Sequence, residues 1–482
     1  MTGGVIIAYV ALLVVVGLYS ARQVRSESDY LVAGRRLGPF VLGATLPATQ
    51  MSAGTAIGTV GYIALYGYQY NWFWLALWTG WLVSMLFVAP RMHEFGRTHG
   101  GMTIPDIVGA RFGRSLRFTV AVVIVVAFLL LFSAEYQGAA TVFNLVFGIS
   151  YVPAVLISAA VVGVYSLSGG LFSVARNDVV QMVVFVAGYV AAAAYALHAV
   201  GGASGLQRRL SNIDPQLLHV LGNTQMPVGT LVGFAIGTGV TFVAYPLDAV
   251  KFYAAAKRST LLRALAIGIL LQVIIAFTLA IIGSAGRAML PRTNLSTSDN
   301  IAPYVALHSM PAIPAGLLMA AVIGAVMAVS SSIIMIIAAA ISHDILPFLR
   351  RTPFSDQSRL RTERLVSGIV VLVGIALAVK PIGSVGTIVL IVQQFMASTI
   401  AVVLIAALNW RRATVAGAAA SMTAGFVGVV AWYLAGDPAG LAPVFGGLPL
   451  AVIAMVVGSL LPGAKPAPSV VGAHAEAAEV TA

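Results

Sequence analysis

Long apolar stretches constrain the fold of this chain more than any other feature. Of its 482 residues, 60% are hydrophobic and only 9% are charged, and the mean hydropathy is +0.97. A soluble domain carries charge on about a quarter of its residues. A helix of roughly 20 apolar residues crosses a bilayer, whereas an open sheet leaves unpaired edges there. The composition excludes an ordinary soluble enzyme and predicts an all-α integral membrane protein.

Thirteen stretches are long and apolar enough to be read as membrane-spanning helices. They cover approximately residues 5–21, 39–66, 72–90, 118–147, 151–167, 179–200, 229–250, 262–285, 311–341, 365–379, 384–408, 413–434 and 444–461. The first has no basic stretch before it and no small-residue cleavage site after it, so we expect a retained span. The last twenty residues are expected to be a disordered tail.

The distribution of basic residues predicts the orientation. With an odd number of spans the two termini face opposite sides, and 22 of the 27 Lys and Arg residues fall in the loops and tail of one side. The positive-inside rule then places the N-terminus outside and the C-terminus in the cytoplasm of a plasma membrane protein. The net charge of +12 is thus a topology signal and does not indicate nucleic-acid binding. Apart from Arg263 at the very start of the eighth stretch, no Lys or Arg lies within an expected span. The absence of cysteine excludes disulfides and thiolate chemistry.

The second and seventh stretches are poor helices for their hydrophobicity. The second contains Pro47, Gly54, Gly58 and Gly61, and the seventh contains Gly233, Gly237, Gly239 and Pro246. Such pairs of interrupted segments are typical of transporters built from inverted repeats, although single small-residue motifs more often serve helix packing. The expected units are 1–38 (first helix and loop), 39–228 and 229–408 (two five-segment repeats), 409–462 (two accessory helices) and 463–482 (tail).

Several motifs resemble the sodium:solute symporter family, which includes sodium/glucose, proline, pantothenate and monocarboxylate carriers. They are Tyr30–Gly38, Met51–Gly58, Tyr165–Asp178 followed by Gln181, and the serine-rich ninth stretch that ends at Asp344. The resemblance covers the first eleven stretches. It implies a LeuT-like fold, alternating access, a solute site midway across the bilayer and a solute:cation symporter.

The same resemblance implies a sodium site with an incomplete set of ligands. Its backbone carbonyls fall on Ala48, Met51 and Ala325, and its two hydroxyl positions fall on Ala328 and Val329. Neither side chain contains oxygen, and a hard cation needs several oxygen ligands. We therefore expect this site to be impaired.

A second sodium site is implied by Ser331, Ser332 and Asp178. A minority of the family uses hydroxyls and an acid at these positions. The alternative is that the serine triplet, Ser330 to Ser332, only packs, with its hydroxyl groups bonded to the preceding turn.

Glu135 is the only acid clearly inside an expected span. A carboxylate at membrane depth costs at least about 2.5 kcal/mol, so it is a functional candidate by default. Because a low dielectric favours the neutral carboxyl group, Glu135 is a candidate proton carrier. The alternative is a protonated structural Glu bonded to another helix. Together with the impaired sodium site, Glu135 indicates possible proton coupling.

The solute contacts are expected from the breaks and from the fourth and eleventh stretches. They are Ser52, Thr55, Gly58, Gln137, Thr241, Tyr245, and Gln393 or Gln394. This modest polarity fits a monocarboxylate or an amino acid. Asp248 and Lys251 are expected to pair with each other.

Other classes of function fit less well. An embedded enzyme would need His or Cys clusters, and the seven His residues form no metal spacing. A sensor would need a signalling domain after residue 461, and a channel conflicts with the family resemblance. The expected partners are a small organic solute, sodium or a proton as coupling cation, and membrane lipid, with neither a cofactor nor nucleic acid.

Overall fold

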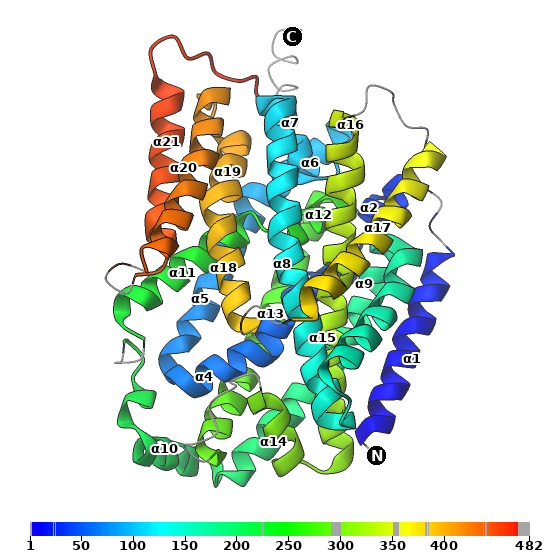
Figure 1. The fold of residues 1–482 in the computed structure, drawn as a ribbon, viewed down its shortest axis with the longest axis vertical. Coiled ribbons are helices and arrows are strands. Elements are labelled where there is room, and N and C mark those ends of the chain that lie inside the picture. The colour runs from blue at the N-terminus through cyan, green and yellow to red at the C-terminus, as the bar shows by residue number, and fades with distance from the viewer. Residues whose placement is uncertain are drawn as a thin grey trace.

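The computed structural model describes residues 2–22, 24, 26–222, 226–290, 300–349, 356–380, 383, 385–436, 438 and 441–470. These residues form helices joined by short connections, and among them the only β pairing is one isolated bridge between Leu37 and Ala255. The fold is therefore all-α over the described part of the chain, as expected (Figure 1).

The helices follow one another along the whole described chain. In order they are α1 (Thr2–Ala21), α2 (Glu27–Val32), η1 (Ala33–Arg35), α3 (Pro39–Ala48), η2 (Gly54–Thr59), α4 (Val60–Tyr66), η3 (Tyr68–Asn71), α5 (Trp72–Val83), η4 (Ser84–Val88), α6 (Ala89–His99), α7 (Ile104–Phe112), α8 (Arg114–Phe147), α9 (Tyr151–Ala199), α10 (Gly202–Ile213), η5 (Pro215–Leu218), α11 (Val228–Val243), α12 (Pro246–Ala254), α13 (Arg258–Met289), α14 (Ile301–Ser309), α15 (Ala312–Ala339), η8 (Ala340–Ile345), α16 (Leu346–Leu349), α17 (Asp356–Ala378), α18 (Val385–Met396), η9 (Ala397–Ala401), α19 (Val402–Asn409), α20 (Val415–Leu434) and α21 (Val444–Leu460).

Each of the thirteen expected stretches coincides with helical residues. Nine helices of the described chain are long and apolar enough to cross a membrane, and three shorter apolar helices accompany them. The fifth and sixth stretches lie together in α9, where Gly170 adopts φ 51° and ψ −156° and separates two helical parts. The number of crossings stays a prediction. The start of α1 and the end of α21 lie at opposite ends of the molecule (Figure 1).

The helix α15 forms the centre of the molecule. Its most apolar window is entirely buried, whereas only 22% of the corresponding window of α1 is buried. A helix that is apolar on all sides is stable only when other helices surround it. The surface of the outer helices is rich in exposed Leu, Val, Ile and Phe, which fits contact with lipid.

Both glycine- and proline-rich stretches are interrupted, as the sequence predicts. The α-helix α3 ends at Ala48, and a π-helix, η2, starts at Gly54. In the seventh stretch, Ala244 and Tyr245 leave helical geometry before Pro246 begins α12. Proline lacks an N–H group and is favoured at the first position of a helix. The backbone is therefore open at two places in the interior, while the repeat relationship stays a prediction.

The last described residues differ from the expected disordered tail. Ala467 donates a backbone hydrogen bond to the Ala413 carbonyl at 2.9 Å, and Ala467 and Val470 are buried. The apolar side chains of this segment explain why it packs against the start of α20. Residues 471–482 lie outside the described residues, as do residues 350–355 of the expected basic cluster.

Candidate functional site

A small cavity lies between the two helix breaks. Its lining includes Ser52 and Thr55 from the first break, Tyr245 from the second, and Gln393 from α18. Aromatic side chains also contribute, among them Tyr62, Tyr70, Phe73 and Phe242. Four of the seven expected solute residues therefore face one cavity. Its volume of about 20 Å³ holds little more than one water molecule, so a solute would need it to expand.

The other expected solute residues lie outside that lining. A Cβ atom at Gly58 would lie 3.2 Å from the Gly386 backbone, so Gly58 allows η2 and α18 to approach closely. The side chain of Gln137 donates to the Gly383 carbonyl at 3.0 Å. Thr241 donates to the carbonyl of Gln393 and so holds that residue in place.

Hydrogen bonds from two different helices hold the neighbouring side chains of Gln393 and Gln394. Thr238 donates to the Gln393 side-chain oxygen at 3.0 Å. The Gln394 side-chain oxygen accepts from the Val444 amide at 3.1 Å, at the start of α21. Of these two glutamines, Gln393 therefore lines the cavity and Gln394 holds an accessory helix.

Glu135 reaches the first break from α8. Its Oε2 atom accepts a hydrogen bond from the Ala53 amide at 2.8 Å. The side chain is fully buried, and no partner is found for Oε1 among the described residues. A carboxylate at this position satisfies an otherwise unpaired amide at the start of a helix. Glu135 therefore caps the second half of the broken helix, next to the cavity-lining Ser52.

The interior holds more charge than the sequence predicts. Asp178, Asp248 and Lys251 are all at most 1% exposed, although Glu135 was the only acid expected inside a span and no cation was expected there. The expectation was wrong because a charge near the end of an apolar stretch can equally well extend to the membrane surface. The packing of α12 against α6, α15, α2 and α3 places Lys251 in the interior.

The buried charges are connected through the first break. The Nζ atom of Lys251 donates to the Thr45 carbonyl at 2.8 Å and also to the Thr49 hydroxyl. Thr45 donates its hydroxyl hydrogen to Asp178. The hydrogen bonds of Lys251 thus go to α3, whereas its expected partner Asp248 interacts with it through charge.

Two glutamines complete the surroundings of Asp248. Gln50 donates to the Asp248 carboxylate at 2.9 Å, and Gln272 of α13 donates to the Gln50 side-chain oxygen. The two broken helices are therefore joined by side chains at the end of α3 and within the first break.

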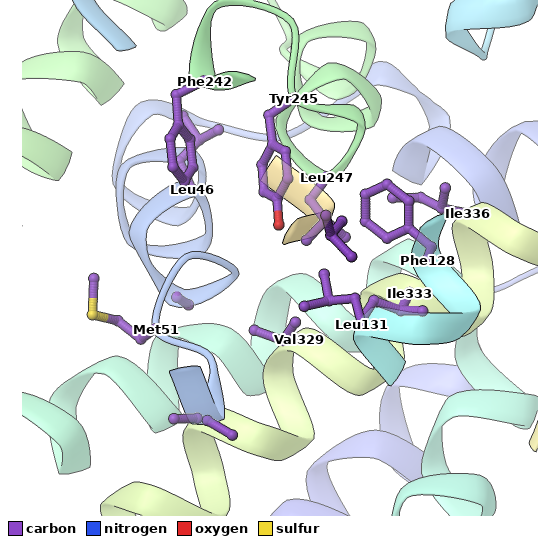
Figure 2. Close-up of a cluster of buried hydrophobic side chains, with 14 of the residues drawn as sticks. Leu46, Met51, Phe128, Leu131, Phe242, Tyr245, Leu247, Val329, Ile333 and Ile336 are labelled. Carbon is purple, nitrogen blue, oxygen red and sulfur yellow. The ribbon is translucent and has the colours of Figure 1, made fainter. Parts of the chain in front are cut away.

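The positions of the expected impaired sodium site lie in an apolar environment. Ala48, Met51, Ala325, Ala328 and Val329 are all buried. Figure 2 shows Val329 in one hydrophobic cluster with Met51, Leu131 and Tyr245. A branched hydrocarbon side chain at this place offers no ligand to a cation.

The serine triplet combines a packed serine with two unsatisfied ones. Ser331 donates to the Ala328 carbonyl at 2.9 Å, which is the bond to the preceding turn that the packing alternative predicts. Ser330 and Ser332 are buried, and their hydroxyl groups have no partner among the described residues. Native proteins rarely leave buried hydroxyl groups unpaired.

Asp178 lies at the level of this triplet. Gly188 of α9 packs against Leu317 and Ala321 of α15, and the part of α9 after Gly170 runs antiparallel to α15 (Figure 1). Asp178 lies ten residues before Gly188 in α9, and Ser331 lies ten residues after Ala321 in α15. Because the two segments are antiparallel, Asp178 and Ser331 lie at the same level. One oxygen of Asp178, and the side-chain polar atoms of Asn177 and Gln181, also lack partners in the described chain. This layer between α9 and α15 is rich in unsatisfied oxygen atoms.

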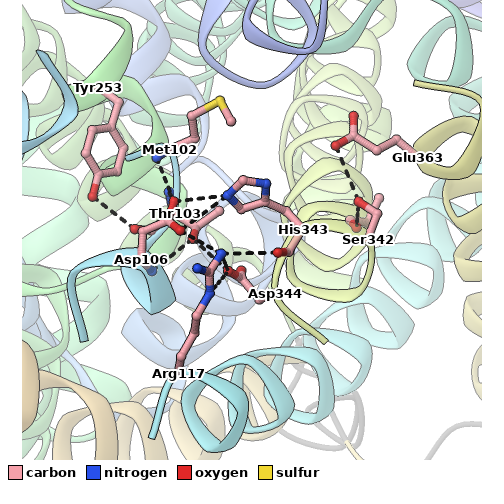
Figure 3. A network of polar contacts seen from close by, with 10 residues as sticks. Met102, Thr103, Asp106, Arg117, Tyr253, Ser342, His343, Asp344 and Glu363 are labelled. Atoms are coloured by element: carbon pink, nitrogen blue, oxygen red, sulfur yellow. Dashed lines mark hydrogen bonds and ion pairs between the residues drawn. The ribbon is translucent and has the colours of Figure 1, made fainter. Parts of the chain in front are cut away.

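A second polar cluster lies beyond the C-terminal end of α15, where η8 meets α7 and α8 (Figure 3). The guanidinium of Arg117 lies 2.7 Å from Asp106 and 2.7 Å from Asp344. His343 bonds to Asp106 at 3.2 Å, and Thr103 donates to Asp344 at 3.3 Å. Burial would raise the pKa of Asp106, but the hydrogen bond and charge of His343 and the charge of Arg117 hold it below its usual range.

The sequence does not predict this cluster, because its members come from separate stretches that meet only in the folded protein. The available signal was the capping box at the start of α7, where Thr103 accepts from the Asp106 amide at 3.2 Å. Asp106, His343 and Asp344 place ligand atoms within 4.8 Å of one another, as metal ligands would. Arg117 already bonds to both carboxylates, so each acid has a cationic partner without a metal. Beside it lies a cavity of about 620 Å³ lined by His99, Arg114 and Glu363.

Comparisons with known proteins agree with the fold and the family resemblance. Residues 30–425 match the sequence model of the sodium:solute symporter family. The chain is 26% identical over 430 residues to the high-affinity proline transporter of Bacillus subtilis, covering 88% of this chain and 90% of that protein. It is 28% identical over 472 residues to the sodium/pantothenate symporter of Escherichia coli, with 94% and 96% covered.

Solved structures show the same architecture. A Na⁺-coupled sialic acid symporter in a substrate-bound outward-open state superposes with a TM-score of 0.83 at 20% identity, covering 97% of this chain and 99% of that chain. The nucleobase-cation-symport-1 family transporter Mhp1 in a closed conformation gives a TM-score of 0.59 at 14% identity and covers 90% of this chain and 95% of its own. These matches confirm the LeuT-like fold.

Proposed function

The chain belongs to the sodium:solute symporter family, and from this premise we propose that it imports a small organic solute, a monocarboxylate or an amino acid, by alternating access. Membership of the family makes it a multi-pass membrane symporter that is coupled to sodium, and it implies no enzymatic activity. The proposed location is the plasma membrane, with the N-terminus outside and the C-terminus in the cytoplasm.

The cavity between the two helix breaks is the observation that carries this proposal. Open backbone inside a membrane is stable only where it is buried in protein or lines a polar site. Here both breaks contribute to one cavity, through Ser52, Thr55 and Tyr245. We propose that these three residues and Gln393 contact the solute, while Gly58, Gln137 and Thr241 shape the surrounding helices.

The polarity of the cavity supports a small solute. Its described lining contains hydroxyl and amide side chains, and no Lys, Arg or His. An anionic group would therefore bind to amide and hydroxyl hydrogens at the breaks. Among the relatives are carriers named for proline and for pantothenate, an amino acid and a carboxylate.

For the coupling ion we propose sodium at the layer of Asp178, Ser331 and Ser332. The free oxygen of Asp178 and the unpartnered Ser332 hydroxyl support a cation there, because they are hard oxygen ligands without another partner. The apolar setting of Ala328 and Val329 argues against the usual site, whose carbonyls would come from Ala48, Met51 and Ala325.

A second candidate is proton coupling through Glu135. Its full burial and its bond to Ala53 favour this candidate, since gain or loss of a proton would change the capping of the helix next to Ser52. The hydrogen bond from a backbone amide favours the ionised form. Glu135 as a fixed cap and Glu135 as a proton carrier therefore predict different transport behaviour.

Uptake into proteoliposomes tests both candidates. The solute is first found by thermal stabilisation of the purified protein with small acids, amino acids and sugars, with and without sodium. Sodium and proton gradients are then imposed separately on the wild type, Ser332→Ala and Glu135→Gln. We expect sodium-driven uptake that Ser332→Ala weakens and Glu135→Gln retains.

The control is Ser158→Ala, because Ser158 is also buried and bonds only to its own helix, at 2.8 Å from the Ala154 carbonyl. Uptake driven by a proton gradient alone, and lost in Glu135→Gln, would replace sodium coupling by proton coupling. Solute flux that neither saturates nor shows counterflow would indicate a channel.

A further inference from the structure

Lys251 places a positive charge where the first broken helix ends. The side chain is 1% exposed, and its ammonium group bonds to the carbonyl of Thr45 and the hydroxyl of Thr49. Both acceptors belong to the final turn of α3 and its cap, where the helix dipole favours a cation. Because Lys251 lies on α12, its contact links the two broken helices directly.

Two buried carboxylates share this one cation. Asp178 and Asp248 both interact with Lys251 through charge, and each also accepts a hydrogen bond from the first broken segment, from Thr45 and Gln50. One oxygen of each carboxylate has no partner among the described residues. With one ammonium and two carboxylates, the formal charge of this group is −1. Buried charges persist only where they are balanced, so the group has room for one further cation.

We propose that Lys251 is a tethered cation that competes with the coupling sodium ion for Asp178. In the absence of sodium the ammonium group neutralises Asp178 and holds α12 against α3. When sodium binds Asp178, the ammonium is left to Asp248, and the contact between the two broken helices weakens. This inference rests on the proposed sodium coupling and adds a residue that sets the sodium affinity and connects ion binding to helix movement.

The expected size of the effect follows from the electrostatics. A unit charge about 6–10 Å from a binding site, at an effective dielectric constant near 20, changes cation affinity by roughly ten- to a hundredfold. A lysine that only fills space would change stability on removal and leave the sodium affinity unchanged. The concentration of sodium needed for half-saturation separates the two roles.

The test measures thermal unfolding of the purified full-length protein as a function of sodium concentration, with choline keeping the ionic strength constant. Lys251→Met removes the charge and keeps the length of the side chain, and Lys251→Arg keeps the charge. We expect half-saturation at sodium concentrations lower by at least about tenfold in Lys251→Met, and within about threefold of the wild type in Lys251→Arg. Half-saturation of folded Lys251→Met at the wild-type concentration would overturn the proposal.

A second variant protects the test against loss of folding. Asp248→Asn combined with Lys251→Met keeps Asp178 and removes the lysine charge from a background that already lacks Asp248, so it is expected to bind sodium at least about tenfold more tightly than Asp248→Asn alone. An equal half-saturation in Asp248→Asn with and without Lys251→Met would likewise overturn the role of Lys251.

Failure of this inference is distinguishable from failure of sodium coupling. Equal sodium responses in the wild type and all variants reject the tethered cation and leave sodium coupling in place. If sodium stabilises Lys251→Met and does not stabilise the wild type, sodium coupling of the natural protein is rejected. That result supports the ammonium group of Lys251 as a permanent replacement for the sodium ion. The absence of a sodium response in every folded variant rejects both.

Discussion

Replacement of Arg117 by methionine isolates the energetic role of the polar cluster near α7 and α16. Arg117 lies 2.7 Å from both Asp106 and Asp344, and the Asp344 side chain is fully buried. Methionine keeps the apolar stem and removes the only guanidinium between the two carboxylates. Two acids within 4.8 Å would then face each other in a poorly solvated setting.

The cost can be worked out from the burial of the partners. Removal of one member of a fully buried ion pair costs roughly 3–5 kcal/mol, because the remaining charge stays desolvated. The side chain of Arg117 is 29% exposed, so water compensates in part. We therefore expect about 2 kcal/mol. A chain of this size has an unfolding entropy on the order of 1 kcal/mol/K if all of it unfolds together, so the Tm falls by at least about 2 °C.

Scanning fluorimetry of the purified protein measures this change through its six tryptophans. Arg114→Met is the matched control, because Arg114 donates its hydrogen bonds to the Pro347 and Phe348 carbonyls, at 2.6 and 2.9 Å. Its removal therefore leaves no carboxylate without a cationic partner. Asp344→Asn should cost less than Arg117→Met, since Arg117 retains Asp106. Equal shifts for Arg117→Met and Arg114→Met would refute the reasoning.

Other regions of the chain give further predictions. Glu135→Ala removes the cap of Ala53 and should cost about 1–2 kcal/mol, whereas Glu135→Gln keeps an acceptor oxygen and should cost less; equal Tm shifts would contradict the capping role. Gly425→Ala would place a Cβ atom 1.8 Å from the Ser398 carbonyl, and we expect a loss of about 1–3 kcal/mol that Gly4→Ala, with open space around it, does not show. The lowered pKa of Asp106 means that its contribution to stability is present above the pKa of an unfolded Asp and is lost as the pH falls below about 4. The Tm difference between wild type and Asp106→Asn should thus shrink as the pH falls from about 5 to 3; growth over this acid range would contradict it.

The helices and the two breaks could be predicted from the sequence because local features determine them. Apolar length predicts a span, and Pro47 and Pro246 predict where helical hydrogen bonding stops. Glu135 was recognisable as an acid surrounded by apolar residues. Its bond to Ala53 could not be predicted, because that amide becomes free only in the folded break.

Contacts between distant stretches could not be predicted. Lys251 ends an apolar stretch, and the sequence does not distinguish a buried lysine at this position from one that extends to the surface. Arg117 and Asp344 are 227 positions apart and meet only when α8 packs beside η8. The pairing of Gln50, Asp248 and Gln272 depends in the same way on three helices.

The two neighbouring glutamines of α18 indicate whether the chain could still transport a solute without its last two helices. Gln393 faces the cavity between the two helix breaks and Gln394 accepts a hydrogen bond from the first amide of α21, although they are adjacent in the chain. The two C-terminal helices, which lie outside the expected repeats, are therefore attached to the cavity lining through one peptide bond. Deletion of α20 and α21 would leave a buried amide acceptor unpaired beside the cavity, and a shortened protein would need a new partner for Gln394 to keep its selectivity.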